Sequence, residues 1–186
     1  MPGKPGEVAG GLFAPIVTTD ALIDATSDRA WVQAMLDTEA ALARVEESLG
    51  IIPAGTAAAI AAECTADAFD ADALGRGARL GGNAVIPLVA ELRERAGPPA
   101  GDWVHFGATS QDIVDTASML IAKRTSAIVE AELVALCSAA AGLCERHRSD
   151  LMVGRTLLQH ALPITFGLKA AGWLTAANSG RTALKG

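Results

Sequence analysis

The stretch SQDIVDTASMLIAKRTSAIVEAELVALCSAAAGLCERH, residues 110–147, decides the fold class of this chain. It contains no proline and a single glycine, Gly142. Its apolar residues recur at helical spacing and are Ile113, Ala117, Leu120, Ile128, Leu133, Leu136, Ala140 and Leu143. A helix of this length would span about 55 Å, longer than a small compact domain needs. Its apolar stripe must therefore be buried against other long helices, which predicts an all-α chain that contains the start of a long-helix bundle.

Turn signals divide the chain into three predicted parts. The run Gly97-Pro98-Pro99-Ala100-Gly101 is the strongest of them and ends a small N-terminal helical domain, residues 12–101. Residues 102–186 then form a partial central helical-bundle domain. Residues 1–11 are rich in glycine and proline and lack the apolar segment of a signal peptide, so we expect a disordered tail there.

The N-terminal domain contains four helical patterns of apolar residues. Ser27 can cap the first of them, and Gly81-Gly82-Asn83 predicts a turn before the last. The four expected helices cover residues 28–49, 53–62, 70–79 and 87–95.

After the long helix, the pattern predicts a second helix from Pro163 to about Ala177. The run Asn178-Ser179-Gly180-Arg181-Thr182 indicates that this helix does not continue. One long helix and the beginning of a partner do not complete a bundle. We therefore expect that the chain is truncated or that it depends on other subunits.

Composition and charge favour some function classes over others. Hydrophobic residues make up 51% of the chain but aromatic residues only 4%, which favours close-packed helices. The formal net charge is −6 and there is no basic stripe, so nucleic acid is not an expected partner. No apolar run approaches the roughly 18 residues of a membrane span, so no membrane association is expected. The absence of a targeting segment and the odd number of cysteines, 3, favour the cytoplasm.

The cysteines are not expected to bind metal. Cys137 and Cys144 lie seven residues apart on one helical face, about 10 Å along the axis, too far for one zinc ion. Cys144 and His147 could share a metal, but no further ligands flank them. Buried, unreactive thiols are the simpler interpretation for these two and for Cys64.

The start of the long helix carries the densest cluster of polar side chains. Thr109-Ser110-Gln111-Asp112 fits a capping box, in which Thr109 caps the helix and Asp112 favours its positive end. Capping alone does not explain the nearby His105 or the number of hydroxyl and amide groups. Because a helix N-terminus has free N–H groups, the same cluster could receive a carboxylate ligand. His105 is either a structural or a catalytic histidine.

A second polar cluster, Gly154–His160, lies where the long helix should end. Arg155 beside Thr156 could grip a carboxylate with its guanidinium fork, or pair with an acidic neighbour. His160, directly before Ala-Leu-Pro, could be a polar group at a helix start or a ligand-binding side chain. Asn83, after two glycines, is most simply a turn residue.

Taken together, three segments resemble the fumarase/aspartase superfamily. They are Val104-His105-Phe106-Gly107-Ala108-Thr109-Ser110-Gln111-Asp112 through Thr116, Gly154-Arg155-Thr156 through Trp173, and Gly82–Val89. The Leu157-Leu158-Gln159 and Leu162-Pro163 contexts are most similar to its bacterial 3-carboxy-cis,cis-muconate cycloisomerase branch. The resemblance covers the chain from Leu12 to about Trp173.

This resemblance implies a fold, an assembly and a reaction. Members are mostly homotetramers built on long helices, with each active site assembled from three subunits. In the cycloisomerase branch, which degrades aromatic acids by the protocatechuate route, a carboxylate of a tricarboxylate substrate adds across a C=C bond to form a lactone. No cofactor or metal is expected. The expected substrate-binding residues are Asn83, His105, Thr109, Ser110, Gln111, Arg155, Thr156 and His160.

The chain departs from the superfamily in two places. Adenylosuccinate lyase and fumarase relatives carry a histidine directly after Gly-Arg-Thr, where this chain has Leu157, which cannot transfer a proton. The flexible loop that holds the serine base does not occur, so we expect that serine beyond residue 186 and no activity of the fragment alone. Another superfamily lyase, such as adenylosuccinate lyase, and a non-catalytic helical fragment remain alternatives.

Overall fold

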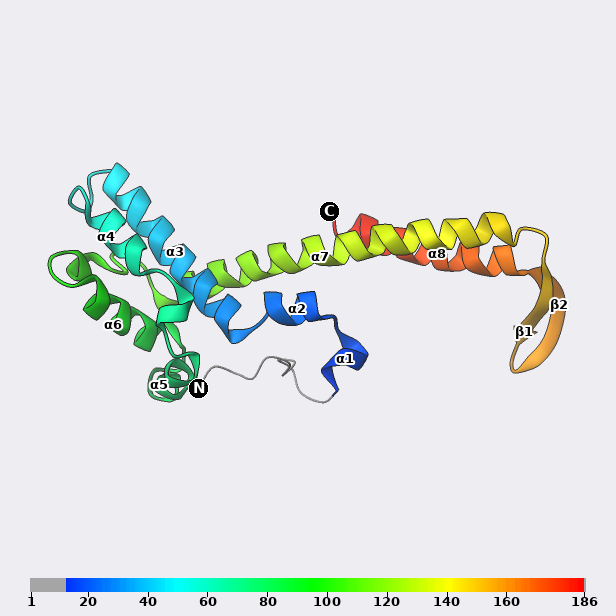
Figure 1. Cartoon of the computed structure of the whole chain (residues 1–186), viewed down its shortest axis with the longest axis horizontal. Helices are drawn as coiled ribbons and strands as arrows, with labels where there is room; N and C mark the ends of the chain where they lie inside the picture. Colours follow the sequence, from blue (N-terminus) through cyan, green and yellow to red (C-terminus); the bar gives the residue numbers. More distant parts are fainter. Residues whose placement is uncertain (1–12, 186) are drawn as a thin grey trace. The chain divides into compact units, whose positions relative to one another are not determined.

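The computed structural model describes residues 13–185, which form two compact units (Figure 1). The division lies inside helix α7 (Ser110–Arg146), between Thr125 and Ser126. The expected tail, residues 1–11, lies outside the described residues. These units are defined by their internal contacts and not as domains, so the domain boundary at residue 101 stays a prediction.

Between residue 13 and the start of α7, the first unit contains eight helical segments. They are α1 (Ala14–Val17), α2 (Asp20–Ala25), α3 (Asp28–Ser48), α4 (Thr56–Glu63), the 3₁₀ turn η1 (Ala66–Ala68), α5 (Ala71–Gly81), α6 (Val85–Ala96) and the 3₁₀ turn η2 (Ala100–Trp103). All four helices expected in this region are present. Ser27 caps α3 as expected, because its side chain accepts a hydrogen bond from the backbone N–H of Ala30. Helix α4 begins at Thr56 rather than Pro53, because Gly55 has a left-handed backbone.

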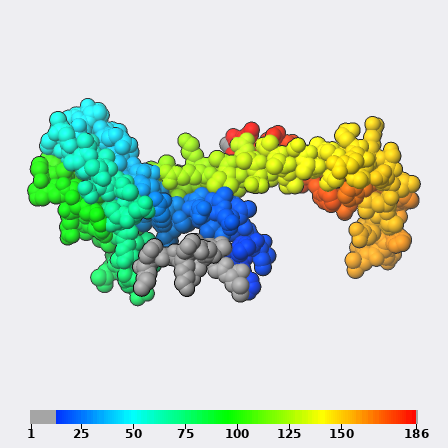
Figure 2. Space-filling view, in the orientation of Figure 1, coloured from blue at the N-terminus to red at the C-terminus, as the bar shows by residue number. Residues whose placement is uncertain are grey.

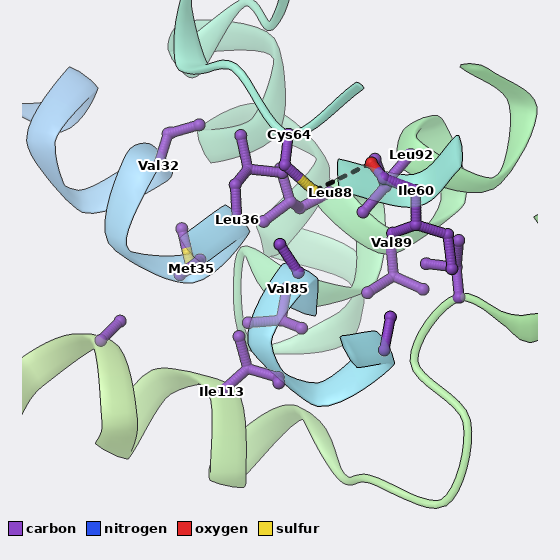
Figure 3. Close-up of a cluster of buried hydrophobic side chains, with 14 of the residues drawn as sticks. Val32, Met35, Leu36, Ile60, Cys64, Val85, Leu88, Val89, Leu92 and Ile113 are labelled. Atoms are coloured by element: carbon purple, nitrogen blue, oxygen red, sulfur yellow. Dashed lines mark hydrogen bonds between the residues drawn. The ribbon is translucent and has the colours of Figure 1, made fainter. Parts of the chain in front are cut away.

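The core of this unit is built from leucine, isoleucine and valine side chains of α3, α4 and α6, with the start of α7 joining them (Figure 3). Leu36, Ile60 and Leu88 are fully buried. Ile113 and Ala117 bring the first turns of α7 into the same core. The N-terminus of α7 is therefore held rigidly by packing.

The second unit contains the rest of α7, a β-hairpin and helix α8 (Phe166–Ala183). Strands β1 (Leu151–Thr156) and β2 (Gln159–Thr165) are antiparallel, with Arg155 paired to His160. Helix α8 runs back along the end of α7 (Figure 1). It begins close to α7, because a Cβ at Gly167 would lie 2.8 Å from the Cys144 carbonyl oxygen.

The structure corrects the expected helix from Pro163 to about Ala177. Pro163 lies in β2, and α8 begins at Phe166, where the Thr165 side chain accepts a hydrogen bond from Leu168 N–H. The expected loss of helix after Asn178 is also wrong, since α8 continues to Ala183. The Asn178 side chain accepts from Arg181 there, and Lys185 forms an ion pair with Glu130 at 2.8 Å.

The all-α expectation is confirmed, with the hairpin as the one exception in the described residues. The long helix predicted over residues 110–147 is observed as Ser110–Arg146. An apolar part of α7 has the length and composition of a membrane span, although no such run was expected from the sequence. A single helix of this kind is also typical of the core of soluble bundles, so it does not indicate a membrane protein.

We predict that Leu36→Ala lowers the free energy of unfolding of the first unit by about 3 kcal/mol, because it leaves a cavity in a filled core. Leu36 is 0% exposed, whereas Leu80 on α5 is 97% exposed. Leu80→Ala is the matched control and should change stability by less than about 0.5 kcal/mol. Urea unfolding followed by circular dichroism measures both variants; similar losses would contradict this description of the core.

Candidate functional site

The segment between η2 and α7 carries His105 and leads into the polar start of α7. Val104 is buried, and its carbonyl oxygen accepts hydrogen bonds from Arg93 Nε at 3.4 Å and Nη2 at 3.1 Å. The next residue, His105, has a left-handed backbone with φ of 61°, as does Gly107 with φ of 68°. This conformation is common for glycine but not for histidine. The anchored turn fixes where the His105 ring lies.

The His105 ring is hydrogen-bonded to a buried carboxylate that was not among the expected site residues. His105 Nδ1 lies 2.6 Å from Oε1 of Glu39 on α3, and the Glu39 side chain is only 1% exposed. Burial raises the pKa of the Glu39 carboxyl, while the hydrogen bond and charge of His105 and the charge of Arg93 oppose that shift. Nδ1 of His105 thus has a structural role, because it is bonded to Glu39. Nε2 is not used in this contact.

Thr109 and Asp112 form the capping box that the sequence predicts. The Thr109 N–H and hydroxyl both donate to Asp112 Oδ2, at 2.9 and 3.0 Å, and the Asp112 N–H donates to Thr109 Oγ1 at 3.4 Å. These bonds from Thr109 hold the pKa of Asp112 below its usual range. Capping therefore occupies the Thr109 hydroxyl.

Neighbouring polar groups differ in whether they have partners. Gln111 donates to Asp115 Oδ1 at 2.7 Å, one turn along α7. Among the hydrogen bonds between residues 13–185, none involves the hydroxyl of Ser110, a half-buried residue. Asn83 Oδ1 accepts from the N–H groups of Val85 and Ile86, so it caps α6 as a turn residue. The Asn83 amide nitrogen is not used in this cap, and its role in binding stays a prediction.

Glu46 is a second buried carboxylate near this turn. It is 7% exposed, its Oε1 lies 3.8 Å from a Cβ built on Gly107, and its Oε2 has no hydrogen-bond partner among the described residues. Burial and the charge of Glu39 raise the pKa of Glu46. The sequence held a signal for both groups, because Glu39 and Glu46 are seven residues apart on the face of α3 that carries Val32 and Leu36.

Arg155, Thr156 and His160 lie on the hairpin of the second unit, with exposed side chains. No ion pair of Arg155 occurs within residues 13–185, so the expected alternative of an acidic neighbour is not observed there. His160 lies in β2, so its interpretation as a polar group at a helix start is wrong. The hairpin stands clear of the helices of its own unit (Figure 2).

The tip of the hairpin is unusual. Leu157 and Leu158 form the two-residue turn with φ of 48° and 62°, and both side chains are almost fully exposed. Such turns favour Asn-Gly, because two left-handed residues strain a leucine backbone. Leu157 occupies the place where the resemblance predicts a histidine in other branches, so the tip offers no group that could transfer a proton.

Comparison with known proteins assigns the fold. A family model described as Lyase matches residues 15–186. The chain belongs to this lyase family. It is 43% identical over 177 residues to the 3-carboxy-cis,cis-muconate cycloisomerase of Bradyrhizobium diazoefficiens, covering 94% of this chain and 39% of the relative. It is 42% identical over 170 residues to the nitrosuccinate lyase of Streptomyces davaonensis, covering 90% and 36%.

A solved lyase structure agrees with this assignment. The 3-carboxy-cis,cis-muconate lactonizing enzyme from Pseudomonas putida superposes with a TM-score of 0.90 at 42% identity, covering 94% of this chain and 40% of that chain. The chain thus spans about two fifths of the length of the relatives it matches. The fumarase/aspartase-like fold expected from the sequence is confirmed, and α7 is a helix of this lyase fold.

The cysteines of this lyase chain are less uniform than expected. Cys64 is buried, and burial raises the pKa of its thiol to about 12, which suits an unreactive group. Cys137 and Cys144 are only half-buried. His147 Nδ1 lies 2.7 Å from Asp150 Oδ2. In the described part of the chain, no three His, Cys, Asp or Glu side chains are grouped to hold a metal ion.

We predict that Glu46→Gln raises the thermal midpoint at pH 8 and not at pH 4. The raised pKa of Glu46 means that its protonated form is favoured by the fold. The associated stability is present at low pH and is lost as pH rises through the folded-state pKa. Glutamine stays neutral at both values. Differential scanning fluorimetry measures the effect, with Glu94→Gln as control because Glu94 is exposed on α6. An equal shift at both pH values would contradict an ionisation cost at Glu46.

Proposed function

We propose that the chain belongs to a 3-carboxy-cis,cis-muconate cycloisomerase and carries the part of its site that binds a substrate carboxylate. The observation that carries the proposal is the polar start of α7. There the Ser110 hydroxyl, which has no partner among residues 13–185, and the first-turn N–H groups lie close in sequence to the Glu39-bound His105. The cycloisomerase relative and the lactonizing enzyme of P. putida support the substrate class.

The chemistry of lactone formation suits these donors. A substrate carboxylate oxygen forms a bond to one carbon of a C=C bond, and the π electron pair moves to the neighbouring carbon. That carbon is next to another carboxylate, so negative charge builds on this second carboxylate until a proton is delivered to the carbon. Donors fixed at the second carboxylate stabilise the charge without rearranging. In the reverse direction, the same donors stabilise β-elimination.

The residues at the α7 start divide this work. Ser110 Oγ has no partner among residues 13–185, so we assign it to the carboxylate that gains charge. The Thr109 hydroxyl is engaged by Asp112, so Thr109 acts through the cap that fixes the first turn. Gln111 reaches substrate only by leaving Asp115. Asn83 lies before α6 rather than α7, and we assign to substrate binding its amide nitrogen, which its cap does not use.

We assign Arg155, Thr156 and His160 to the other carboxylates of the tricarboxylate substrate. Their exposed side chains are compatible with this role, and Arg155 suits two-point binding of a carboxylate. A serine base, a homotetrameric assembly, a cytoplasmic location and the absence of a cofactor complete the proposal. They are supported by the family resemblance.

The nitrosuccinate lyase relative supports a second candidate reaction, since its identity of 42% is almost as high as that of the cycloisomerase. Elimination from a nitro-substituted dicarboxylate makes the same demand on donors at the α7 start. Adenylosuccinate lyase remains an alternative against which Leu157 argues. A non-catalytic helical fragment is the alternative from another class.

A substrate series separates these candidates. The chain should bind 3-carboxy-cis,cis-muconate at least about tenfold more tightly than nitrosuccinate or adenylosuccinate, because a third carboxylate adds a charge-assisted hydrogen bond. Isothermal titration calorimetry measures this order. Tighter binding of nitrosuccinate would reject the cycloisomerase assignment, and binding of none of the three would favour the non-catalytic fragment.

Ser110→Ala tests the site directly. We expect the affinity for 3-carboxy-cis,cis-muconate to fall about tenfold, because a hydrogen bond to a charged group is lost, with little change in the thermal midpoint. Ser118→Ala is the matched control on the same helix, because the Ser118 hydroxyl donates to the Val114 carbonyl oxygen at 2.7 Å. An unchanged affinity with lowered stability would return Ser110 to a structural role.

A further inference from the structure

Glu39 and Glu46 are the buried charged side chains among residues 13–185. A carboxylate removed from water is costly unless a donor compensates it. Glu46 Oε2 has no such donor in the described chain, whereas Glu39 Oε1 lies 2.6 Å from Nδ1 of His105. The two carboxylates therefore differ in what they can do: only Glu39 is coupled to a side chain of the candidate site.

The backbone of His105 supplies a second observation. Its φ of 61° lies in the left-handed region, which is uncommon for a residue with a Cβ and costs conformational energy. The adjacent Val104 is held by burial and by Arg93, and the His105 ring is held by Glu39. The backbone of His105 is therefore strained in the conformation that directs its imidazole toward the Glu39 carboxylate.

We propose that Glu39 is a positioning residue of this site: by occupying Nδ1 of His105, it fixes the ring and leaves Nε2 as the nitrogen that meets a substrate carboxylate. The proposal rests on the proposed function, because it needs a carboxylate ligand at the α7 start. An ionised Glu39 accepts from Nδ1–H, so the neutral ring carries its proton on Nδ1. When the ring is protonated, Nε2–H becomes the donor to the ligand.

The charged groups around the pair are compatible with this role. Arg93 acts on Glu39 through its charge, and Glu46 lies near Glu39 on the same helix. The charge of His105 acts on Asp112, which is already bonded to Thr109. Neither Arg93 nor Asp112 forms an ion pair with His105 in the described residues, so Glu39 is its structural partner.

The experiment measures the His105 tautomer and ligand binding in the same chain. Long-range ¹H–¹⁵N correlation spectra, recorded above the pH at which the ring titrates, distinguish Nδ1–H from Nε2–H. There are only 3 histidines to assign, and His147, bonded to Asp150 at 2.7 Å, is an internal reference. Glu39→Gln keeps an oxygen acceptor, Glu39→Leu removes it, and Glu46→Gln is the control for a buried carboxylate on α3.

We expect Nδ1–H in the wild-type chain, in Glu39→Gln and in Glu46→Gln, and Nε2–H in Glu39→Leu. Binding is compared with the His105 ring protonated, the state in which Nε2–H donates to the ligand. The affinity for 3-carboxy-cis,cis-muconate should then fall about tenfold in Glu39→Leu, because the ring loses the acceptor that orients it, and remain within about threefold of wild type in the other two variants. An Nε2–H ring in the wild-type chain would overturn the inference even if Glu39→Leu did not fold. An unchanged affinity in folded Glu39→Leu would overturn it too.

The proposed function fails in a different way. Wild-type chain that shows the Nδ1–H ring but binds nitrosuccinate more tightly than 3-carboxy-cis,cis-muconate would reject the substrate, while the dependence of tautomer and affinity on Glu39 could still be measured with nitrosuccinate. The two failures are therefore distinguishable.

Discussion

The hydrogen bond between buried Glu39 and His105 is the constraint on which the candidate site depends. It places a carboxylate in the apolar face of α3, where desolvation opposes its charge. The fold keeps it there and also accepts a left-handed backbone at His105, in the segment between η2 and α7. Groups that cost stability in this way are typical of functional sites, and here both belong to one contact.

Packing fixes the start of α7, which carries the other polar groups of the candidate site. Ile113 and Ala117 anchor the first turns of the helix in the core formed by α3, α4 and α6 (Figure 3). The capping bonds between Thr109 and Asp112 fix the turn that precedes them. Ser110 and the first N–H groups of α7 therefore stand on a rigid element, which is what stabilisation of a developing charge requires.

Much of the helical fold could be predicted from the sequence, because helical periodicity and capping residues are local signals. The ends of α3 and α7 lie within one residue of their predicted positions for this reason. The hairpin could not be predicted, because Leu157-Leu158 replaces the Asn-Gly signal of a two-residue turn. Its strands also showed no alternation of buried and exposed residues, since most of their side chains are exposed.

The candidate site was only partly predictable for a related reason. His105, Thr109 and Ser110 stand out because they are polar residues crowded at a helix start. Glu39 lies 66 positions before His105, and its role depends on tertiary contact rather than on local pattern. A carboxylate on the apolar face of a predicted helix was the available sign. Helical periodicity by itself does not distinguish Glu39 from the other residues of the helix.

The central claim is that a substrate carboxylate binds at the start of α7, beside the Glu39-bound His105. Titration of ¹⁵N-labelled chain with 3-carboxy-cis,cis-muconate, followed by backbone amide and imidazole chemical shifts, tests it most directly. Saturable shifts centred on Thr109–Gln111 and the His105 ring are predicted. Saturable shifts elsewhere, with the α7 start and His105 unchanged, would contradict it.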